Sequence, residues 1–312
     1  MFATSQICSV SSAVLVALVV QNTSLVFAMK YAYRKSAPPF HASVVVAASE
    51  ALKLCMSMVV VVVERQKRSA LGRSASWPIF DLQLAVPSLL YIIQNNLLFF
   101  AVSRLSPTVY LACTQSKVIT TALFSKFLLG TSLRWVQVIS LALLTVGMIL
   151  VQLPEGRRSR ISEGESHFAG LIAVSGASVT SGFAGVYLER LFKTCDKEVG
   201  IFGRNVQLAV FSLPIAIFWS LSDNFQGSWG YGLLQGFDSI IILVIFLQAV
   251  GGLIVGAVMK FASSVLKCFS IAASICLSVL ISCHLGFHQM NTSLVMGTLL
   301  VITSIFMYSR RT

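Results

Sequence analysis

The segment Val109–Leu129, VYLACTQSKVITTALFSKFLL, decides the fold, because it is apolar enough to cross a bilayer yet carries a lysine, Lys117, near its middle. A second apolar segment, Ser263–Ser282 (SSVLKCFSIAASICLSVLIS), carries Lys267, and neither segment contains Asp or Glu. A charged side chain at bilayer depth costs about 2.5–3.5 kcal/mol on insertion scales, so it usually faces a watery cavity and meets a partner. The pattern therefore indicates a membrane transporter whose anionic ligand, phosphorylated or carboxylated, supplies the missing negative charge.

The composition of the whole chain is typical of a polytopic helical membrane protein. Mean hydropathy is +0.84, and 56% of the residues are hydrophobic against 11% charged. A span needs about 20 apolar residues. The sequence predicts an all-α fold with ten membrane-spanning helices, at about residues 9–29, 41–63, 82–103, 107–129, 135–153, 168–188, 203–221, 239–259, 263–285 and 292–309.

The net charge of +12 belongs mainly to loops that flank the apolar runs, so we interpret it as juxtamembrane charge and expect no nucleic-acid partner. With a cytosolic N-terminus, twelve Lys and Arg residues fall in cytosolic loops and seven on the opposite side. This bias predicts that both termini are cytosolic. Six of the seven cysteines lie in or beside apolar segments, which is not a disulfide framework, and we see no zinc-type spacing or other cofactor motif.

The two halves of the chain resemble each other. Lys267 follows Lys117 by 150 residues, and each lysine lies in the fourth of five predicted spans in its half. Five spans per half give the second half the opposite orientation. We therefore predict two inverted five-helix repeats, residues 1–156 and 157–312, that together form one membrane domain with a site near the midplane. The alternative is chance similarity between two apolar sequences.

Polar residues recur at helical spacing around each lysine, and two such stripes could line one cavity. The stripes are Tyr110, Thr114, Lys117 and Thr121 in one segment, and Ser263, Lys267, Ser270 and Ser274 in the other. Alternatively, the hydroxyl groups bond to their own helix backbone, and the lysines extend to the membrane surface, as we expect of Lys126. A lysine ammonium is a compact charge with three donors, which suits phosphate, and two of them could hold a diphosphate.

Other polar residues lie within predicted spans. Gln94, Asn95 and Asn96 are consecutive amides, which suit either a nucleobase and sugar or bonds between helices. Glu50 and Lys53 are three residues apart, and we predict a structural ion pair, with a gating or site role as the alternative. Glycines recur in two spans, where close helix packing is the default interpretation: Gly182, Gly185, Gly251, Gly252 and Gly256.

At these residues the chain resembles the Golgi nucleotide-sugar transporters of the drug/metabolite transporter superfamily, in the branch that carries UDP-galactose, UDP-N-acetylglucosamine and CMP-sialic acid. The matching stretches are Tyr91–Leu97 (YIIQNNL), Tyr110–Lys117 (YLACTQSK), Ser181–Glu189 (SGFAGVYLE), Arg204–Gln207 (RNVQ), Leu247–Leu253 (LQAVGGL) and Lys260–Phe269 (KFASSVLKCF). The family usually has Asp-Asn where this chain has Ser263-Ser264, and Gly where it has Cys268.

The resemblance implies ten helices in inverted halves, and exchange of a cytosolic nucleotide sugar for a luminal nucleoside monophosphate across the Golgi membrane, with the endoplasmic reticulum as the alternative compartment. It also implies that Lys117 and Lys267 face the phosphates, and that five residues line the nucleotide cavity: Tyr110, Asn95, Asn96, Ser181 and Asn205. The local sequence is closer to the UDP-sugar members, so we favour UDP-galactose, UDP-N-acetylglucosamine or both.

Three alternatives stay open at this point. One is a CMP-sialic acid carrier or a broader organic-phosphate carrier, and another is a membrane scaffold without transport. The third is a membrane enzyme, which we disfavour because the four histidines share no motif and Glu50 is the one deep carboxylate. The sequence also leaves the oligomeric state open between a monomer and a homo-oligomer.

Overall fold

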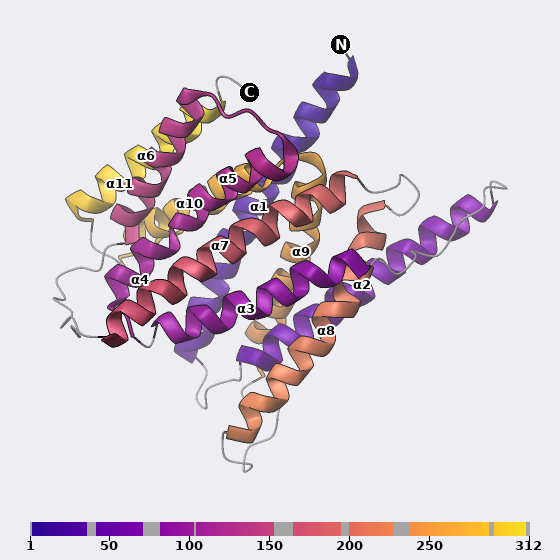
Figure 1. The fold of residues 1–312 in the computed structure, drawn as a ribbon. Helices are drawn as coiled ribbons and strands as arrows, with labels where there is room; N and C mark the ends of the chain where they lie inside the picture. The colour runs from indigo at the N-terminus through magenta and orange to yellow at the C-terminus, as the bar shows by residue number, and fades with distance from the viewer. Residues whose placement is uncertain are drawn as a thin grey trace. The chain divides into compact units, whose positions relative to one another are not determined.

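The computed structural model describes residues 2–35, 42–70, 82–102, 104–152, 165–194, 200–226, 237–286 and 290–309, and all regular secondary structure among them is helical. Nine of the helices in these ranges are long and apolar enough to cross a membrane, which confirms the predicted all-α polytopic protein. The helices (Figure 1) are α1 (Phe2–Lys35), α2 (Ala42–Ala70), η1 (Leu82–Leu84), α3 (Ala85–Val102), α4 (Pro107–Thr114), α5 (Ser116–Leu129), α6 (Trp135–Gln152), α7 (Glu165–Lys193), α8 (Gly200–Gln226), α9 (Ser239–Phe261), α10 (Ser264–His284) and α11 (Thr292–Ser309).

The predicted span 107–129 differs from the others, because two helices, α4 and α5, take the place of one continuous helix. They are separated by Gln115, whose backbone N–H bonds to the carbonyl of Ala112, three residues back. Around this point the hydroxyl of Thr114 donates to the carbonyl of Leu111 (2.8 Å) and that of Ser116 to Cys113 (2.6 Å). Hydroxyl bonds of the same kind also occur within the continuous helices α6 and α10, so they accompany the interruption and are not a sufficient cause of it.

Several residues used in the sequence predictions lie outside the described ranges. They are Arg73, Arg157, Arg158, Arg160, Lys197, Arg310 and Arg311 from the orientation count, together with Cys195, His41 and His288.

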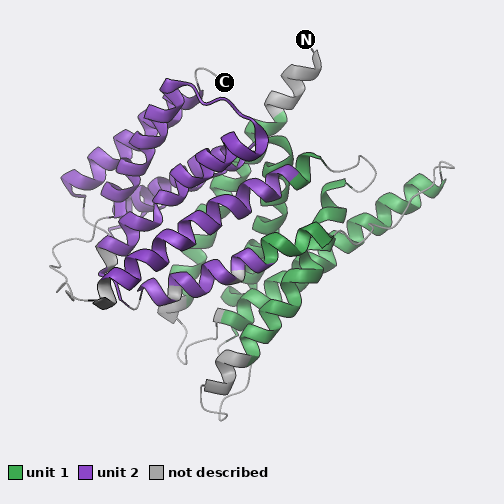
Figure 2. Ribbon diagram, in the orientation of Figure 1, with its two compact units in different colours: residues 1–88, 191–262 green, residues 89–190, 263–312 purple. Residues whose placement is uncertain are grey.

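The chain divides into two compact units (Figure 2). Unit 1 comprises Met1–Ser88 and Leu191–Ala262, and unit 2 comprises Leu89–Arg190 and Ser263–Thr312. Each unit draws helices from both halves of the chain, so the units do not coincide with the predicted repeats, and the division at residue 156 stays a prediction.

In unit 1, α1 packs on α9, and α2 packs on α8 and α9. The buried core between α1, α2 and α9 contains Ala32, Val45, Ile241, Val244 and Ile245. The glycines of α9 allow neighbouring side chains to lie against its backbone, as predicted for close packing. A Cβ atom at Gly252 would lie 2.7 Å from Cδ of Lys53, and one at Gly256 would lie 2.7 Å from Nδ2 of Asn205.

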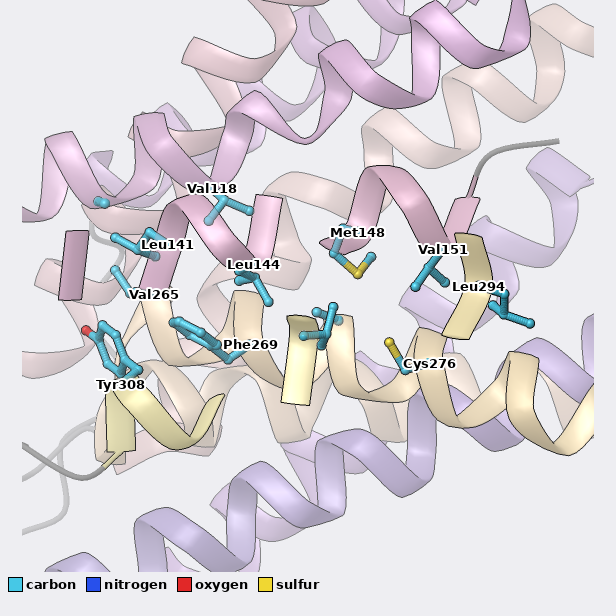
Figure 3. Close-up of a cluster of buried hydrophobic side chains, with 13 residues drawn as sticks. Val118, Leu141, Leu144, Met148, Val151, Val265, Phe269, Cys276, Leu294 and Tyr308 are labelled. Carbon is cyan, nitrogen blue, oxygen red and sulfur yellow. The ribbon is translucent and has the colours of Figure 1, made fainter. Parts of the chain in front are cut away.

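In unit 2, α11 packs along α6 and α10 packs on α5 (Figure 1). The core shared by these four helices, drawn in Figure 3, includes Val118, Leu144, Val265, Phe269 and Val301. At the α6–α11 contact a Cβ atom at Gly147 would lie 2.9 Å from the carbonyl oxygen of Gly297, so the two backbones approach closely. A second core lies among α3, α4 and α7 and includes Ala101, Ala173 and Val174.

Candidate functional site

Lys117 is the second residue of α5, directly after the interruption at Gln115. The preceding helix, α4, begins with Ser106 as N-cap, whose hydroxyl accepts the N–H of Val109 (3.4 Å), and with Pro107 in the first helical position. Gln115 itself has helical backbone angles (φ −70°, ψ −17°), so α4 and α5 follow each other almost without a break. The charge that favours an anion at this point is therefore the Lys117 ammonium.

Lys267 lies in the first turn of α10, and its backbone N–H bonds to the carbonyl of Ser263 (2.9 Å). Ser263 is the N-cap of this helix, because its hydroxyl accepts the N–H of Leu266 (3.2 Å). The chain therefore places both lysines in the same way, in the first turn of a helix that begins inside an apolar stretch.

The packing of α5 against α10 brings the two lysines together. Val118 and Ala122 of α5 meet Val265 and Phe269 of α10 in the core of unit 2. Lys117 and Lys267 lie close enough for their positive charges to repel each other, and neither ammonium group forms an ion pair or a hydrogen bond with the residues that the structure describes. Two ammonium groups without a counter-charge in an apolar environment favour the binding of an anion.

One neighbour of the lysines, Cys268, was not among the predicted site residues. Its thiol lies near both ammonium groups and near the Thr121 hydroxyl, which belongs to the predicted stripe. Thr121 itself is buried and donates to the carbonyl of Lys117 (2.6 Å). The signal for Cys268 was its position directly after Lys267.

Some hydroxyl groups of the predicted polar stripes bond to the backbone of their own helix, which was the alternative prediction. The hydroxyl of Thr114 bonds to its own helix, as does that of Ser274, which donates to the carbonyl of Ile271 (2.7 Å). Ser270 is buried in α10, with 6% of its surface exposed. Tyr110 is half-buried in α4, where it packs against the core shared with α3 and α7.

The three amides lie on α3 within unit 2. Gln94 is half-buried and its Oε1 has no hydrogen-bond partner in the described residues, whereas Asn95 and Asn96 are exposed. Ser181 is half-buried on α7. Nine of the ten predicted site residues therefore belong to unit 2.

Asn205 is the exception, because it lies in unit 1 on α8. It is 3% exposed, its Nδ2 donates to the carbonyl of Ile201 (3.1 Å), and its amide lies against Gly256. In unit 1 it therefore makes a contact between α8 and α9.

The predicted ion pair of Glu50 and Lys53 is confirmed in unit 1. The Lys53 ammonium lies 2.5 and 2.6 Å from the two carboxylate oxygens, and the hydroxyl of Ser212 on α8 also donates to Glu50. The two side chains are 12% and 22% exposed, for Lys53 and Glu50 in that order. This lysine has a counter-charge of its own, unlike Lys117 and Lys267.

Comparison with known proteins identifies the family. The sequence model of the nucleotide-sugar transporter family matches residues 7–309 of this chain. The chain belongs to the nucleotide-sugar transporter family. Membership confirms the resemblance, makes this a multi-pass membrane transporter, and excludes the enzyme alternative.

Several characterised nucleotide-sugar transporters are similar over nearly the whole chain. The UDP-N-acetylglucosamine/UDP-N-acetylgalactosamine transporter nstp-4 of Caenorhabditis elegans is 36% identical, over 94% of this chain and 91% of its own. The human UDP-N-acetylglucosamine transporter is 37% identical, with 93% and 92% covered. The mouse UDP-galactose translocator is 34% identical, with 95% and 77% covered. One solved crystal structure shares the fold, with a TM-score of 0.68 at 17% identity over 96% of this chain and 98% of its own.

Proposed function

We propose that this protein is an antiporter that exchanges a cytosolic UDP-sugar for luminal UMP across the Golgi membrane by alternating access. The sugar is galactose, N-acetylglucosamine or both. The observation that carries the proposal is the pair of lysines, Lys117 and Lys267, which lie close to each other in unit 2 and form no ion pair with the described residues.

The chemistry of the lysines fits the phosphates of a nucleotide sugar. Each ammonium group offers three donors and a full charge, and a hydrogen bond to a charged group contributes about 1.5–3 kcal/mol. In this proposal Lys117 and Lys267 each bind one phosphate of the diphosphate.

The remaining predicted residues fit the neutral part of the ligand. Gln94, Asn95 and Asn96 present both donors and acceptors, as a uracil edge or a sugar hydroxyl requires. In the proposal they line the nucleotide cavity with Tyr110 and Ser181, together with Thr114 and Ser270. The uridine and the two sugars are proposed because the similar proteins are named as UDP-sugar transporters.

The proposed transport cycle requires two inverted repeats and a defined orientation. Helices that are equivalent under the predicted repeat pack on each other within the units: α2 on α8, α5 on α10, and α6 on α11. Such self-pairing is expected where a two-fold axis relates two halves, and it supports the repeat. The basic bias of the loops supports cytosolic termini.

Uptake into proteoliposomes tests the exchange. Because an antiporter returns its site mainly when loaded, vesicles preloaded with UMP should take up UDP-N-acetylglucosamine or UDP-galactose several-fold faster than empty vesicles. Equal rates with empty and loaded vesicles would argue for a uniporter or a channel. Stimulation by internal CMP in place of UMP would move the assignment to CMP-sialic acid, and no uptake of any nucleotide sugar would favour a scaffold.

A further inference from the structure

We propose that one face of α7 sets the distance between Lys117 and Lys267 and thereby makes the site prefer a diphosphate to a monophosphate. This inference rests on the proposed function, in which both lysines hold phosphate. The face consists of Ser178, Gly182, Gly185 and Glu189, which follow one another at spacings of four, three and four residues and so lie on one side of the helix. We call these four residues the α7 spacer face.

The first half of the spacer face holds the lysine segment of α5. The hydroxyl of Thr120 donates to the carbonyl of Ser178 (2.8 Å), and the hydroxyl of Ser178 donates to the carbonyl of Cys113 (3.4 Å). Gly182 leaves no room for a side chain, since a Cβ atom there would lie 2.8 Å from the backbone N of Thr121. The backbone of α7 therefore lies directly against the turn of α5 that follows Lys117.

The second half of the spacer face holds the start of α10. The backbone N–H of Ser264 donates to Oε2 of Glu189 (2.7 Å), and its hydroxyl donates to the carbonyl of Gly185 (2.8 Å). Glu189 and Ser264 are each 1% exposed. A buried carboxylate on the first N–H of a helix is a charge-assisted bond that also complements the helix dipole. It fixes the position of the turn that carries Lys267.

Both lysine segments are thus attached to the same helix, one at Ser178–Gly182 and the other at Gly185–Glu189. The two attachments are about seven residues apart, which at a rise of about 1.5 Å per residue is roughly 10 Å along the helix axis. Because α7 is one uninterrupted helix between the two attachments, the backbones that carry the lysines have a defined separation. A diphosphate that spans both ammonium groups depends on this separation, whereas a monophosphate can be held by one of them. The spacer face should therefore affect UDP binding more than UMP binding.

The test compares the dissociation constants of UDP and UMP in purified full-length variants by ligand-induced thermal shift. In Gly182→Ala the new methyl group meets backbone atoms of α5, which must move. The matched control on the same helix is Gly176→Ala, where a Cβ atom would lie 3.5 Å from Cδ1 of Leu97, an ordinary contact. We expect UDP affinity in Gly182→Ala to fall about tenfold relative to UMP affinity, as for the loss of one charged contact, and the ratio to be unchanged in Gly176→Ala.

A second pair of variants tests the other attachment. Glu189→Ala removes the acceptor for the Ser264 N–H and should also lower the UDP preference, whereas Glu189→Gln keeps an acceptor oxygen and should retain the wild-type ratio. This pair decides the question if Gly182→Ala is not recovered in folded form. Equal losses for UDP and UMP in both Gly182→Ala and Glu189→Ala would overturn the inference, because α7 would then only support the fold. Failure of the proposed function would be distinct: Lys117→Gln and Lys267→Gln would both retain wild-type affinity for both ligands.

Discussion

At the scale of single residues, some lysines within the predicted spans form an ion pair and others do not. Lys53 pairs with Glu50 on the next turn of the same helix, so this pair adds no net charge to the membrane interior. Lys117 and Lys267 have no such partner among the described residues and repel each other. An arrangement that costs free energy in the empty protein is expected where a ligand provides the compensating charge.

The Glu50–Lys53 pair should matter for stability. Glu50→Gln leaves the Lys53 charge without its carboxylate, and breaking a buried pair costs about 3–5 kcal/mol; because both side chains are partly exposed, we expect the lower end of that range. The thermal unfolding temperature should fall measurably. The double variant Glu50→Gln/Lys53→Met should regain part of the loss, since it removes the orphaned charge. A Glu50→Gln protein as stable as the wild type would show that the pair contributes nothing to the fold.

At the scale of elements, hydropathy was sufficient to locate nearly every helix, because each span must satisfy its backbone internally over about 20 residues. The interruption at Gln115 could not be predicted in the same way. Its signal was the run Thr114-Gln115-Ser116, but such residues also occur in continuous membrane helices. Hydroxyl bonds like those to Leu111 and Cys113 also occur in the continuous helices α6 and α10, so the residue types alone do not distinguish the two cases.

The close contact of α6 and α11 gives a prediction at this scale. A Cβ atom at Gly297 would lie 2.8 Å from the carbonyl oxygen of Gly147 and 2.8 Å from the backbone N of Val151. Backbone atoms cannot rotate away, so Gly297→Ala should destabilise the protein by about 1–3 kcal/mol through overpacking. Thermal unfolding checks this, with Gly176→Ala as the control that should not lower the unfolding temperature, because Ala is the better helix former and its methyl group fits there. Equal behaviour of the two variants would contradict the packing of α6 on α11.

At the scale of the whole molecule, the sequence singled out the two lysines but did not indicate how the helices group into units. The lysine pair was visible because charge in an apolar segment is rare, and the structure brings both lysines together in unit 2. The interleaved composition of the units was not predictable, because it depends on contacts between helices distant in the chain, such as α1 with α9. Asn205 falls in unit 1 for the same reason.

Orientation is a prediction at this scale as well. An epitope tag at either terminus should be accessible to antibody from the cytosolic side of intact membrane vesicles, because twelve basic residues lie beside the spans on the side predicted to be cytosolic and seven on the other. Protection of both tags until the membrane is permeabilised would invert the orientation and with it the direction of transport.

The most direct test of the central claim, that Lys117 and Lys267 bind phosphate, is the affinity of single-lysine variants for UMP and UDP, measured by ligand-induced thermal shift. Lys117→Gln and Lys267→Gln should each weaken UDP binding by roughly 10- to 150-fold, the equivalent of one contact of about 1.5–3 kcal/mol. Their unfolding temperature without ligand should not fall, because each change removes an unpaired charge. Lys126→Gln, at an exposed position in the last turn of α5, should bind like the wild type. Unchanged UDP and UMP affinity in both site variants would contradict the account.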